Sequence, residues 1–298
     1  MAPNLDRRGP RPRCLDWLLL RRHRPQSAPE ALVLAFVSGK GGTGKSFLAT
    51  NFAIALYRQG LRTCVVDCDF GLGNAHLLFG MNPKLTVQHL LGRQARIEDV
   101  VQPTPHGPSL VAGGSGIRGL CEIDDDRLQL FGSSLAWLAA RNDVLVLDGP
   151  AGLSAQSLMT ALVATDVVLV TNPEIAALTD AYALIKCLSR HDPSPAVHVA
   201  VNRVSDPGLG RATFERLADV ARRFAGRQIH YAGAIPEDSA VTQRRLGQPP
   251  LILSHPQCRT SLAVVEMIET LRRRIGPLVP RARGQDLEQR VRASLRSG

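Results

Sequence analysis

The stretch Gly39-Lys-Gly-Gly-Thr-Gly-Lys-Ser46 directly follows the apolar run Ala31-Leu-Val-Leu-Ala-Phe-Val37. The apolar run has the length and composition of a buried strand, and the residues after Ser46 continue in a helical pattern. Glycines at such a junction let the backbone curl until its N–H groups point inward, and the helix adds its positive N-terminal end. The stretch therefore predicts a phosphate-binding loop.

Two residues of this loop have specific chemical roles in that interpretation. Lys45 would reach the β- and γ-phosphates of a nucleoside triphosphate, and the Ser46 hydroxyl would ligate Mg²⁺. The alternative is a glycine-rich surface turn, which the strand before and the helix after argue against. The predicted ATP-binding residues of the loop are Gly39, Lys40, Gly41, Gly42, Thr43, Gly44, Lys45, Ser46 and Phe47.

The rest of the chain alternates apolar runs with helical patterns. Continuous Val/Ile/Leu strands separated by helices predict an α/β fold of the P-loop NTPase class, with a mostly parallel, twisted sheet of about seven to eight strands and helices on both faces. Strands are expected at 32–38, 63–68, 109–112, 143–148, 166–171, 196–202 and 229–235, and helices at 44–59, 124–140, 154–164, 174–190, 208–225 and 259–274. This ATPase domain is expected to span 31–275.

The two ends of the chain are predicted to be basic tails. Residues 1–30 carry seven Arg against three acids and read as a disordered Pro/Arg-rich tail, and residues 276–298 carry five Arg against two acids. The overall charge of +10 suits contact with nucleic acid or anionic lipid, or simple solubility. Within the second tail, 285–297 places Leu287, Val291 and Leu295 on one stripe of a basic amphipathic helix that could contact a membrane surface.

The expected location is the cytoplasm, with peripheral contact at the inner face of the membrane as a further expectation. No apolar stretch reaches the roughly 18 residues that a membrane span needs. The short apolar run near the start lacks a small-residue cleavage site, which argues against a signal peptide. The six cysteines form no Cys-x-x-Cys pair and read as reduced, mostly buried thiols.

Carboxylates end two of the expected strands. Val65-Val-Asp-Cys-Asp-Phe-Gly71 places Asp67 and Asp69 on the same side of an extended chain, where like charges repel unless a cation or water network uses them. Asp148 ends four apolar residues and would hold a water bound to Mg²⁺, as in a Walker B element. Capping of the next helix is the structural alternative for Asp67 and Asp69.

The loop resembles the deviant Walker A motif of the MinD/ParA ATPases, because Lys40 follows the first glycine. The resemblance implies a homodimer around two ATP molecules, in which Lys40 crosses to the partner's nucleotide. Asp69 would then orient the attacking water, with Lys40 and Lys45 as the other catalytic residues. Asp67 would support the Mg²⁺ shell with Ser46 and Asp148. The resemblance also assigns switch II to Gly149, Pro150, Ala151 and Gly152, and the adenine pocket to Asn202, Arg203, Pro236 and Glu237.

One subgroup of the family is the most similar, the flagellar number regulators of the FlhG/FleN (YlxH) type. Gly113-Gly-Ser-Gly-Ile117 and Asp180-Ala-Tyr-Ala-Leu-Ile-Lys186 carry this resemblance, which runs from about 33 to 275. It implies a slow, partner-stimulated ATPase that regulates flagellar number, placement or biosynthesis, with an SRP-type flagellar GTPase as protein partner. The chain departs from the subgroup at its N-terminus, which lacks an Asp-Gln-Ala-x-x-Leu-Arg motif, and at Asn172 and Ile175.

Other functions remain open at this point. A ParA-type ATPase for DNA segregation would bind DNA through surface Lys and Arg, and a relative that localises pili or secretion systems is a further reading. A more remote alternative is an iron–sulphur carrier like the nitrogenase iron protein, which shares the fold. Such a carrier needs a second cysteine after switch II, and 149–163 contains none.

Overall fold

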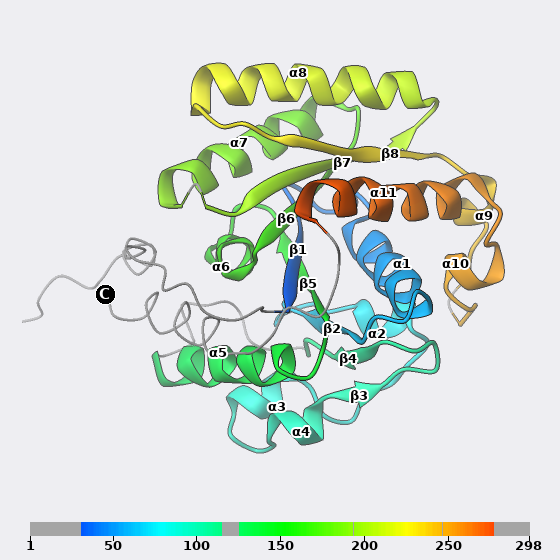
Figure 1. The fold of residues 1–298 in the computed structure, drawn as a ribbon. Coiled ribbons are helices and arrows are strands. Elements are labelled where there is room, and N and C mark those ends of the chain that lie inside the picture. Colours follow the sequence, from blue (N-terminus) through cyan, green and yellow to red (C-terminus); the bar gives the residue numbers. More distant parts are fainter. Residues whose placement is uncertain (1–30, 115–124, 193, 246, 277–298) are drawn as a thin grey trace, which may run out of the picture.

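An eight-stranded sheet forms the centre of the molecule in the computed structural model (Figure 1). The strands lie in the order β3-β4-β2-β5-β1-β6-β7-β8, and every neighbouring pair is parallel except β3 with β4. They are β1 (Leu32–Ser38), β2 (Thr63–Asp67), β3 (Gln102–Pro103), β4 (Ser109–Val111), β5 (Val144–Ala151), β6 (Asp166–Thr171), β7 (Ala196–Val204) and β8 (His230–Pro236). The predicted fold class and strand number are confirmed.

Helices cover both faces of the sheet, as predicted (Figure 1). One face packs against α3 to α8 and the other against α1, α2, α10 and α11, which gives two separate hydrophobic cores. The helices are α1 (Lys45–Arg58), α2 (Ala75–Leu78), α3 (Val87–Leu91), α4 (Ile97–Val100), α5 (Asp125–Ala139), α6 (Ala155–Val163), α7 (Ile175–His191), α8 (Pro207–Ala225), α9 (Ser239–Thr242), α10 (Leu251–Ser254) and α11 (Arg259–Ile275).

The structure describes residues 31–114, 125–192, 194–245 and 247–276. The two predicted tails, the amphipathic stripe of 285–297 and most of the glycine-rich stretch 113–117 therefore lie outside the described residues. The described strands and helices lie between Leu32 and Ile275.

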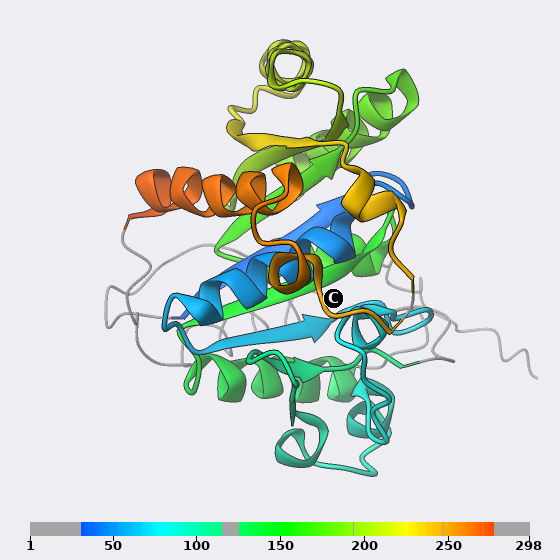
Figure 2. The same ribbon diagram turned by 90° about the vertical axis from the view of Figure 1, so that its right-hand side faces the viewer.

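Strand β1 lies in the middle of the sheet and carries the phosphate-binding loop at its end. All seven of its residues are buried, because helices cover it from both sides. It pairs with β5 on one side and β6 on the other. Figure 2 shows the parallel strands ending at one common edge. In sheets of this kind ligands bind beyond the carboxyl ends of the strands, so this edge is where the functional residues should gather.

The sequence patterns missed the shortest elements. Strand β3 has two residues, and five of the helices have only four or five. A segment of this length contains about one helical turn, so it has no repeating hydrophobic period to detect. One boundary was also wrong. Strand β5 continues to Ala151 instead of ending at Asp148, because the backbone beyond Asp148 stays paired with β1, as in the register of Ser38 with Ala151.

Candidate functional site

The phosphate-binding loop begins at the end of β1 and ends at the start of α1. Gly42 and Gly44 have φ values of 78° and 89°, in the left-handed region that favours glycine. Gly44 is the N-cap of α1, so the positive end of a 14-residue helix faces the loop. This backbone has the form of an anion cradle, as the sequence predicted.

The first glycine of the loop is needed for close packing. A Cβ atom on Gly39 would collide with the backbone of Asp180 in the middle of α7 and come within 2.7 Å of the Ala181 nitrogen. Backbone cannot move aside as a flexible side chain can, so a larger residue would push the loop away from α7. The loop is therefore seated directly on this helix.

Lys45 is buried and joined to the predicted magnesium ligands. Its Nζ atom donates to Asp148 Oδ1 at 2.5 Å and to Ser46 Oγ at 3.1 Å. Only 10% of the lysine side chain and 4% of the aspartate side chain are exposed, so the two charges neutralise each other inside the protein. The structure thus brings Lys45, Ser46 and Asp148 together at one point, and their roles toward phosphate and Mg²⁺ stay predictions.

Asp67 is buried beside Asp148. The two residues are register partners on β2 and β5. Burial, and next the negative charge of Asp148, raise the pKa of Asp67 to about 7. The carboxylate accepts hydrogen bonds from the backbone N–H groups of Asp69 at 3.0 Å and Ala75 at 3.1 Å. Two buried carboxylates this close form a hard-oxygen site that suits a divalent cation.

Two glycines make room for the Asp67 carboxylate. A Cβ atom on Gly73 would lie 2.7 Å from Asp67 Oδ2. A Cβ atom on Gly113 would lie 3.1 Å from Asp67 Oδ1 and 2.5 Å from the Asp69 carbonyl oxygen. Gly113 begins the glycine-rich stretch that the sequence singled out, and its role is steric: it lets β4 end against these aspartates.

Asp69 lies in the loop after β2, where its side chain organises a turn. Its Oδ1 atom accepts from the backbone N–H groups of Leu72 at 2.9 Å and Gly71 at 3.3 Å. The residue is partly exposed, unlike Asp67, which is 1% exposed. The suggested alternative of helix capping applies to Asp67, which bonds the first N–H of α2, and not to Asp69.

The thiol of Cys68, between the two aspartates, has low reactivity. Cys68 is buried and free, and burial raises its pKa, with a further contribution from the charges of Asp67 and Asp148. Burial likewise raises the pKa of Cys64, to about 12. These two cysteines are therefore core residues, as the sequence predicted.

Lys40, the other lysine of the loop, pairs with a residue outside the loop. Its Nζ atom donates to Glu174 Oε2 at 2.7 Å, and both side chains are partly exposed, by 32% and 60%. The lysine lowers the pKa of Glu174 through this hydrogen bond. Glu174 is the N-cap of α7 and was not among the predicted site residues. Glu174 lies 134 positions from Lys40 in the sequence, so only the folded chain brings the two residues together.

The predicted adenine residues gather at the ends of β7 and β8. Asn202 Nδ2 donates to the Thr43 carbonyl oxygen at 2.7 Å, so this side chain lies directly on the phosphate loop. Arg203 has a φ of 56°, an unusual conformation for a residue with a side chain. The Glu237 N–H donates to the Val204 carbonyl at 2.9 Å, which ties the segment after Pro236 to the end of β7. Contact of these residues with an adenine base stays a prediction.

The predicted switch II segment, 149–152, forms the end of β5 and the bend after it. Gly149 and Pro150 are buried, and Gly152 has a φ of 87°. The Gly152 N–H donates to the Ser38 carbonyl at 2.9 Å, so the segment ends beside the start of the phosphate loop. A Cβ atom on Gly149 would lie 3.3 Å from the Phe36 carbonyl oxygen, which leaves little space between the two strands.

The arrangement fits a nucleotide with magnesium. The Thr43 hydroxyl is buried and has no hydrogen-bond partner among the described residues, which is unusual for a buried hydroxyl. No group of three or more His, Cys, Asp or Glu residues in the described part of the chain could hold a metal by itself. Ser46, Asp67 and Asp148 offer only oxygen atoms, which suits Mg²⁺ bound together with phosphate and water.

Comparison with known proteins identifies the family. The family model of the CobQ/CobB/MinD/ParA nucleotide binding domain matches residues 34–250, which include the phosphate loop and all the strands apart from the first two residues of β1. The chain belongs to the MinD/ParA family. The predicted resemblance is therefore confirmed, and the matching family model describes a nucleotide binding domain.

Three relatives of this MinD/ParA protein are informative. The antiactivator FleN of Pseudomonas aeruginosa is 32% identical over 78% of this chain and 82% of its own length. The flagellum site-determining protein YlxH of Helicobacter pylori is 36% identical over 71% of both chains. The septum site-determining protein MinD of Pyrococcus horikoshii, solved with Mg-ADP, has a TM-score of 0.69 and 25% identity over 84% of this chain and 99% of its own.

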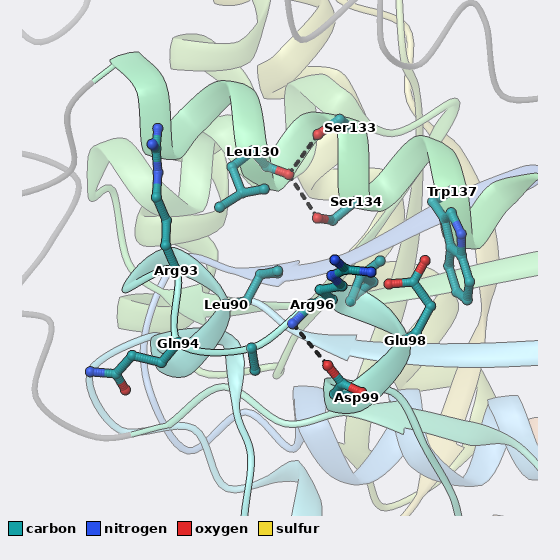
Figure 3. Close-up of a pocket in the computed structure, with 12 residues that line it drawn as sticks. Leu90, Arg93, Gln94, Arg96, Glu98, Asp99, Leu130, Ser133, Ser134 and Trp137 are labelled. Carbon is teal, nitrogen blue, oxygen red and sulfur yellow. Dashed lines mark hydrogen bonds between the residues drawn. The ribbon is translucent and has the colours of Figure 1, made fainter.

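A pocket of the MinD/ParA domain lies away from the nucleotide site. It has a volume of about 660 Å³ and lies between the α3–α4 turn and α5 (Figure 3). Arg96 and Glu98 line it on one side, and Ser134 and Trp137 on the other. None of the predicted phosphate, magnesium or adenine residues lines this pocket.

No described helix combines the length and the apolar character that crossing a bilayer requires.

Proposed function

We propose that this MinD/ParA protein is an ATP-dependent, dimerising switch that regulates flagellar number, placement or biosynthesis. The main observation in favour of a switch is that the two loop lysines lie in different environments. Lys45 is buried against Asp148 inside the site, while Lys40 lies at the rim and reaches outward to Glu174. The flagellar part is supported by the similarity to FleN and YlxH.

The cofactors in this proposal are ATP and Mg²⁺. A relative with the same fold carries Mg-ADP, and the orphan hydroxyl of Thr43 and the oxygen set of Ser46, Asp67 and Asp148 suit such a ligand. When bound, Mg²⁺ neutralises charge on the phosphate oxygens. Lys45 exchanges part of its contact with Asp148 for the phosphates, which stay surrounded by the N–H groups of the loop.

Hydrolysis is an in-line attack of water on the γ-phosphoryl group, without a covalent intermediate. Asp69 orients the water, and Lys45 together with Lys40 of the partner copy stabilises the negative charge. Asp69 Oδ1 accepts from the N–H groups of Gly71 and Leu72 in the described state, so this turn holds the carboxylate in place. Turnover is slow until nucleotide and partner complete the site.

The dimer forms through the face that surrounds the phosphate loop. Leu72, Leu153 and Ile175 are 77%, 46% and 85% exposed, although each is apolar. They lie after β2, after the switch II segment and at the start of α7, and these three places all border the site. Apolar side chains exposed together at a site rim favour burial against a second surface. A second copy of the chain is the partner that covers this face, because Lys40 lies at the same rim.

The protein works in the cytoplasm with a protein partner, for which an SRP-type flagellar GTPase is the candidate. The predicted basic amphipathic helix of 285–297 would give the dimer weak, peripheral affinity for the inner face of the membrane. A DNA-segregation role is the second candidate. Several surface arginines that would serve it are already paired with acids, as are Arg222 and Arg223 with Asp219 and Arg272 with Glu269.

The experiment combines a cellular and a biochemical readout. Deletion of the gene in its own host should change the number or position of flagella seen by electron microscopy, and the Asp69→Ala variant should not restore the wild-type pattern. Unchanged flagella would contradict the flagellar role. ATP-dependent retention on DNA at moderate salt, together with plasmid or chromosome loss, would instead support segregation. Calorimetry that detects no ATP binding with Mg²⁺ would refute the switch itself.

A further inference from the structure

One peptide unit in the site is held at both of its ends. The carbonyl of Cys68 accepts a hydrogen bond from Gln156 Nε2, and the N–H of the same peptide, which belongs to Asp69, donates to Asp67 Oδ1 at 3.0 Å. The bond from Gln156 is buried, and the bond from the Asp69 N–H is partly buried. With its two polar groups bound, this peptide cannot rotate freely, and its orientation sets the direction in which the Asp69 side chain leaves the backbone.

Gln156 reaches this peptide from the other switch segment. It lies in the first turn of α6, which begins three residues after Gly152. Its side chain is only 7% exposed. The Gln156 carbonyl accepts from Thr160 Oγ1 at 2.8 Å, and the Ser154 hydroxyl accepts from the Ser157 N–H at 3.1 Å as the cap of the same helix. Gln156 is thus fixed to the start of a rigid helix that follows the predicted γ-phosphate sensor.

We infer that Gln156 is a positioning residue for ATP hydrolysis, whose amide transmits the position of the 149–152 segment to the peptide that carries Asp69. The inference rests on the proposed role of Asp69. A shift of 149–152 moves the first turn of α6 and, with it, the Gln156 side chain. The Cys68 carbonyl follows, because separation would leave a buried acceptor without a partner.

The test separates positioning from stability by means of Gln156→Met. Methionine has a similar length and is apolar, so it fills the space but donates no hydrogen bond. We expect kcat to fall roughly 10- to 100-fold, since a small displacement of a group that orients a reactant is costly. The dissociation constant for ATP with Mg²⁺ should stay within about two-fold of wild type, because the described hydrogen bonds of Gln156 go to Cys68 and Thr160 and not to the phosphate loop.

Thr165→Val is the matched control. The Thr165 hydroxyl accepts from the Val33 N–H at 3.2 Å and donates to the Val33 carbonyl at 2.9 Å, at the opposite end of β1 from the phosphate loop. This variant also loses side-chain hydrogen bonds to backbone, so thermal stability should fall while kcat stays unchanged. Hydrogen exchange gives a second readout: amides of 68–72 should exchange faster in Gln156→Met and not in Thr165→Val.

The outcomes are distinguishable. If Asp69→Ala is inactive and Gln156→Met hydrolyses ATP at the wild-type rate, the inference about Gln156 is wrong and the proposed function stands. If Gln156→Met loses ATP affinity as much as kcat, Gln156 is only structural. If Asp69→Ala retains full activity, the proposed role of Asp69 is wrong, and the inference about Gln156 that rests on it is wrong as well. Should Gln156→Met not fold, Gln156→Asn, whose amide is one methylene too short, must show the same fall in kcat without loss of affinity.

Discussion

Lys40 Nζ lies 2.7 Å from Glu174 Oε2, so the lysine that the family resemblance assigns to the partner's nucleotide is paired within its own chain. This ion pair must open before Lys40 can reach a second copy. The pair is partly exposed, and exposed ion pairs are weak, so breaking it opposes dimerisation only modestly. It also links the phosphate loop to the N-terminus of α7.

We therefore expect Glu174→Gln to promote dimerisation in the presence of ATP. Removal of the carboxylate frees Lys40, and the dimer dissociation constant should fall roughly two- to five-fold, as suits the loss of an exposed ion pair. Sedimentation equilibrium with ATP and a slowly hydrolysed analogue measures it. Lys40→Ala is the control, and it should weaken dimerisation far more than nucleotide affinity. A dimer that is equally stable in wild type and Lys40→Ala would contradict the role of Lys40.

Asp69→Ala should trap the protein in its ATP-bound dimer. Loss of the group that orients water is expected to slow hydrolysis by about 10²-fold or more, while Lys45, Ser46 and Asp148 still bind the nucleotide. Phosphate release and size-exclusion chromatography with ATP check the two parts separately. Normal phosphate release from this variant would show that another residue orients the water.

Gly113→Ala should destabilise the fold without touching the phosphate loop. The added Cβ atom would lie 2.5 Å from the Asp69 carbonyl and 3.1 Å from Asp67 Oδ1, so the end of β4 must shift. Overpacking of this kind costs about 1–3 kcal/mol, which a denaturation curve resolves. Gly41→Ala is the comparison, because a Cβ atom there meets nothing within 4 Å. Equal stability of the two variants would argue against crowding at Gly113.

Acid should destabilise the edge of the sheet around His230. Burial, and next the charges of His198 and Arg274, lower the pKa of His230 below 6.5, while Asp166 opposes this. The Arg274 guanidinium lies 3.2 Å from His230 Nδ1, so protonation would bring two cations together. A lowered pKa in the folded state means that stability is complete above about pH 6.5 and declines as the pH falls through the folded-state value.

The variant His230→Gln isolates this contribution. Glutamine is neutral at every pH used, so its melting temperature should fall less between pH 7 and pH 5 than that of wild type. Parallel slopes for the two proteins would show that His230 does not contribute to the acid sensitivity. Since His230 lies at the start of β8, far along the strand from Pro236, nucleotide binding at pH 7 should be the same in both.

The sequence predicted the long elements and the charged groups of the site, because both have local signals. The seven main strands are continuous apolar runs, and Lys45, Asp67 and Asp148 each stand at a strand end or in a glycine-rich loop. Glu174 and Gln156 could not be found in this way. Each acts through one hydrogen bond to a residue 134 or 88 positions away, and neither belongs to a local pattern.

The same limit applies to the short elements and to Gly113. A four-residue helix such as α9 is too short to show a repeating hydrophobic pattern. The need for glycine at 113 appears only in the folded chain, where the end of β4 lies against the Asp67 carboxylate at the end of β2. The extension of β5 to Ala151 also depends on a neighbour, since β1 supplies the pairing. Local pattern therefore predicts the long elements, whereas the contacts between distant elements decide how the site is supported.

The buried thiol of Cys68 has a practical consequence. It lies between two aspartates at the centre of the nucleotide site, yet its raised pKa and its burial keep it from forming a thiolate at neutral pH. Alkylating reagents and exposure to air should consequently spare this position. A maleimide dye should therefore react with the partly buried thiols of Cys187 and Cys258 before it reaches Cys68, so labelling can proceed while the nucleotide site stays unmodified.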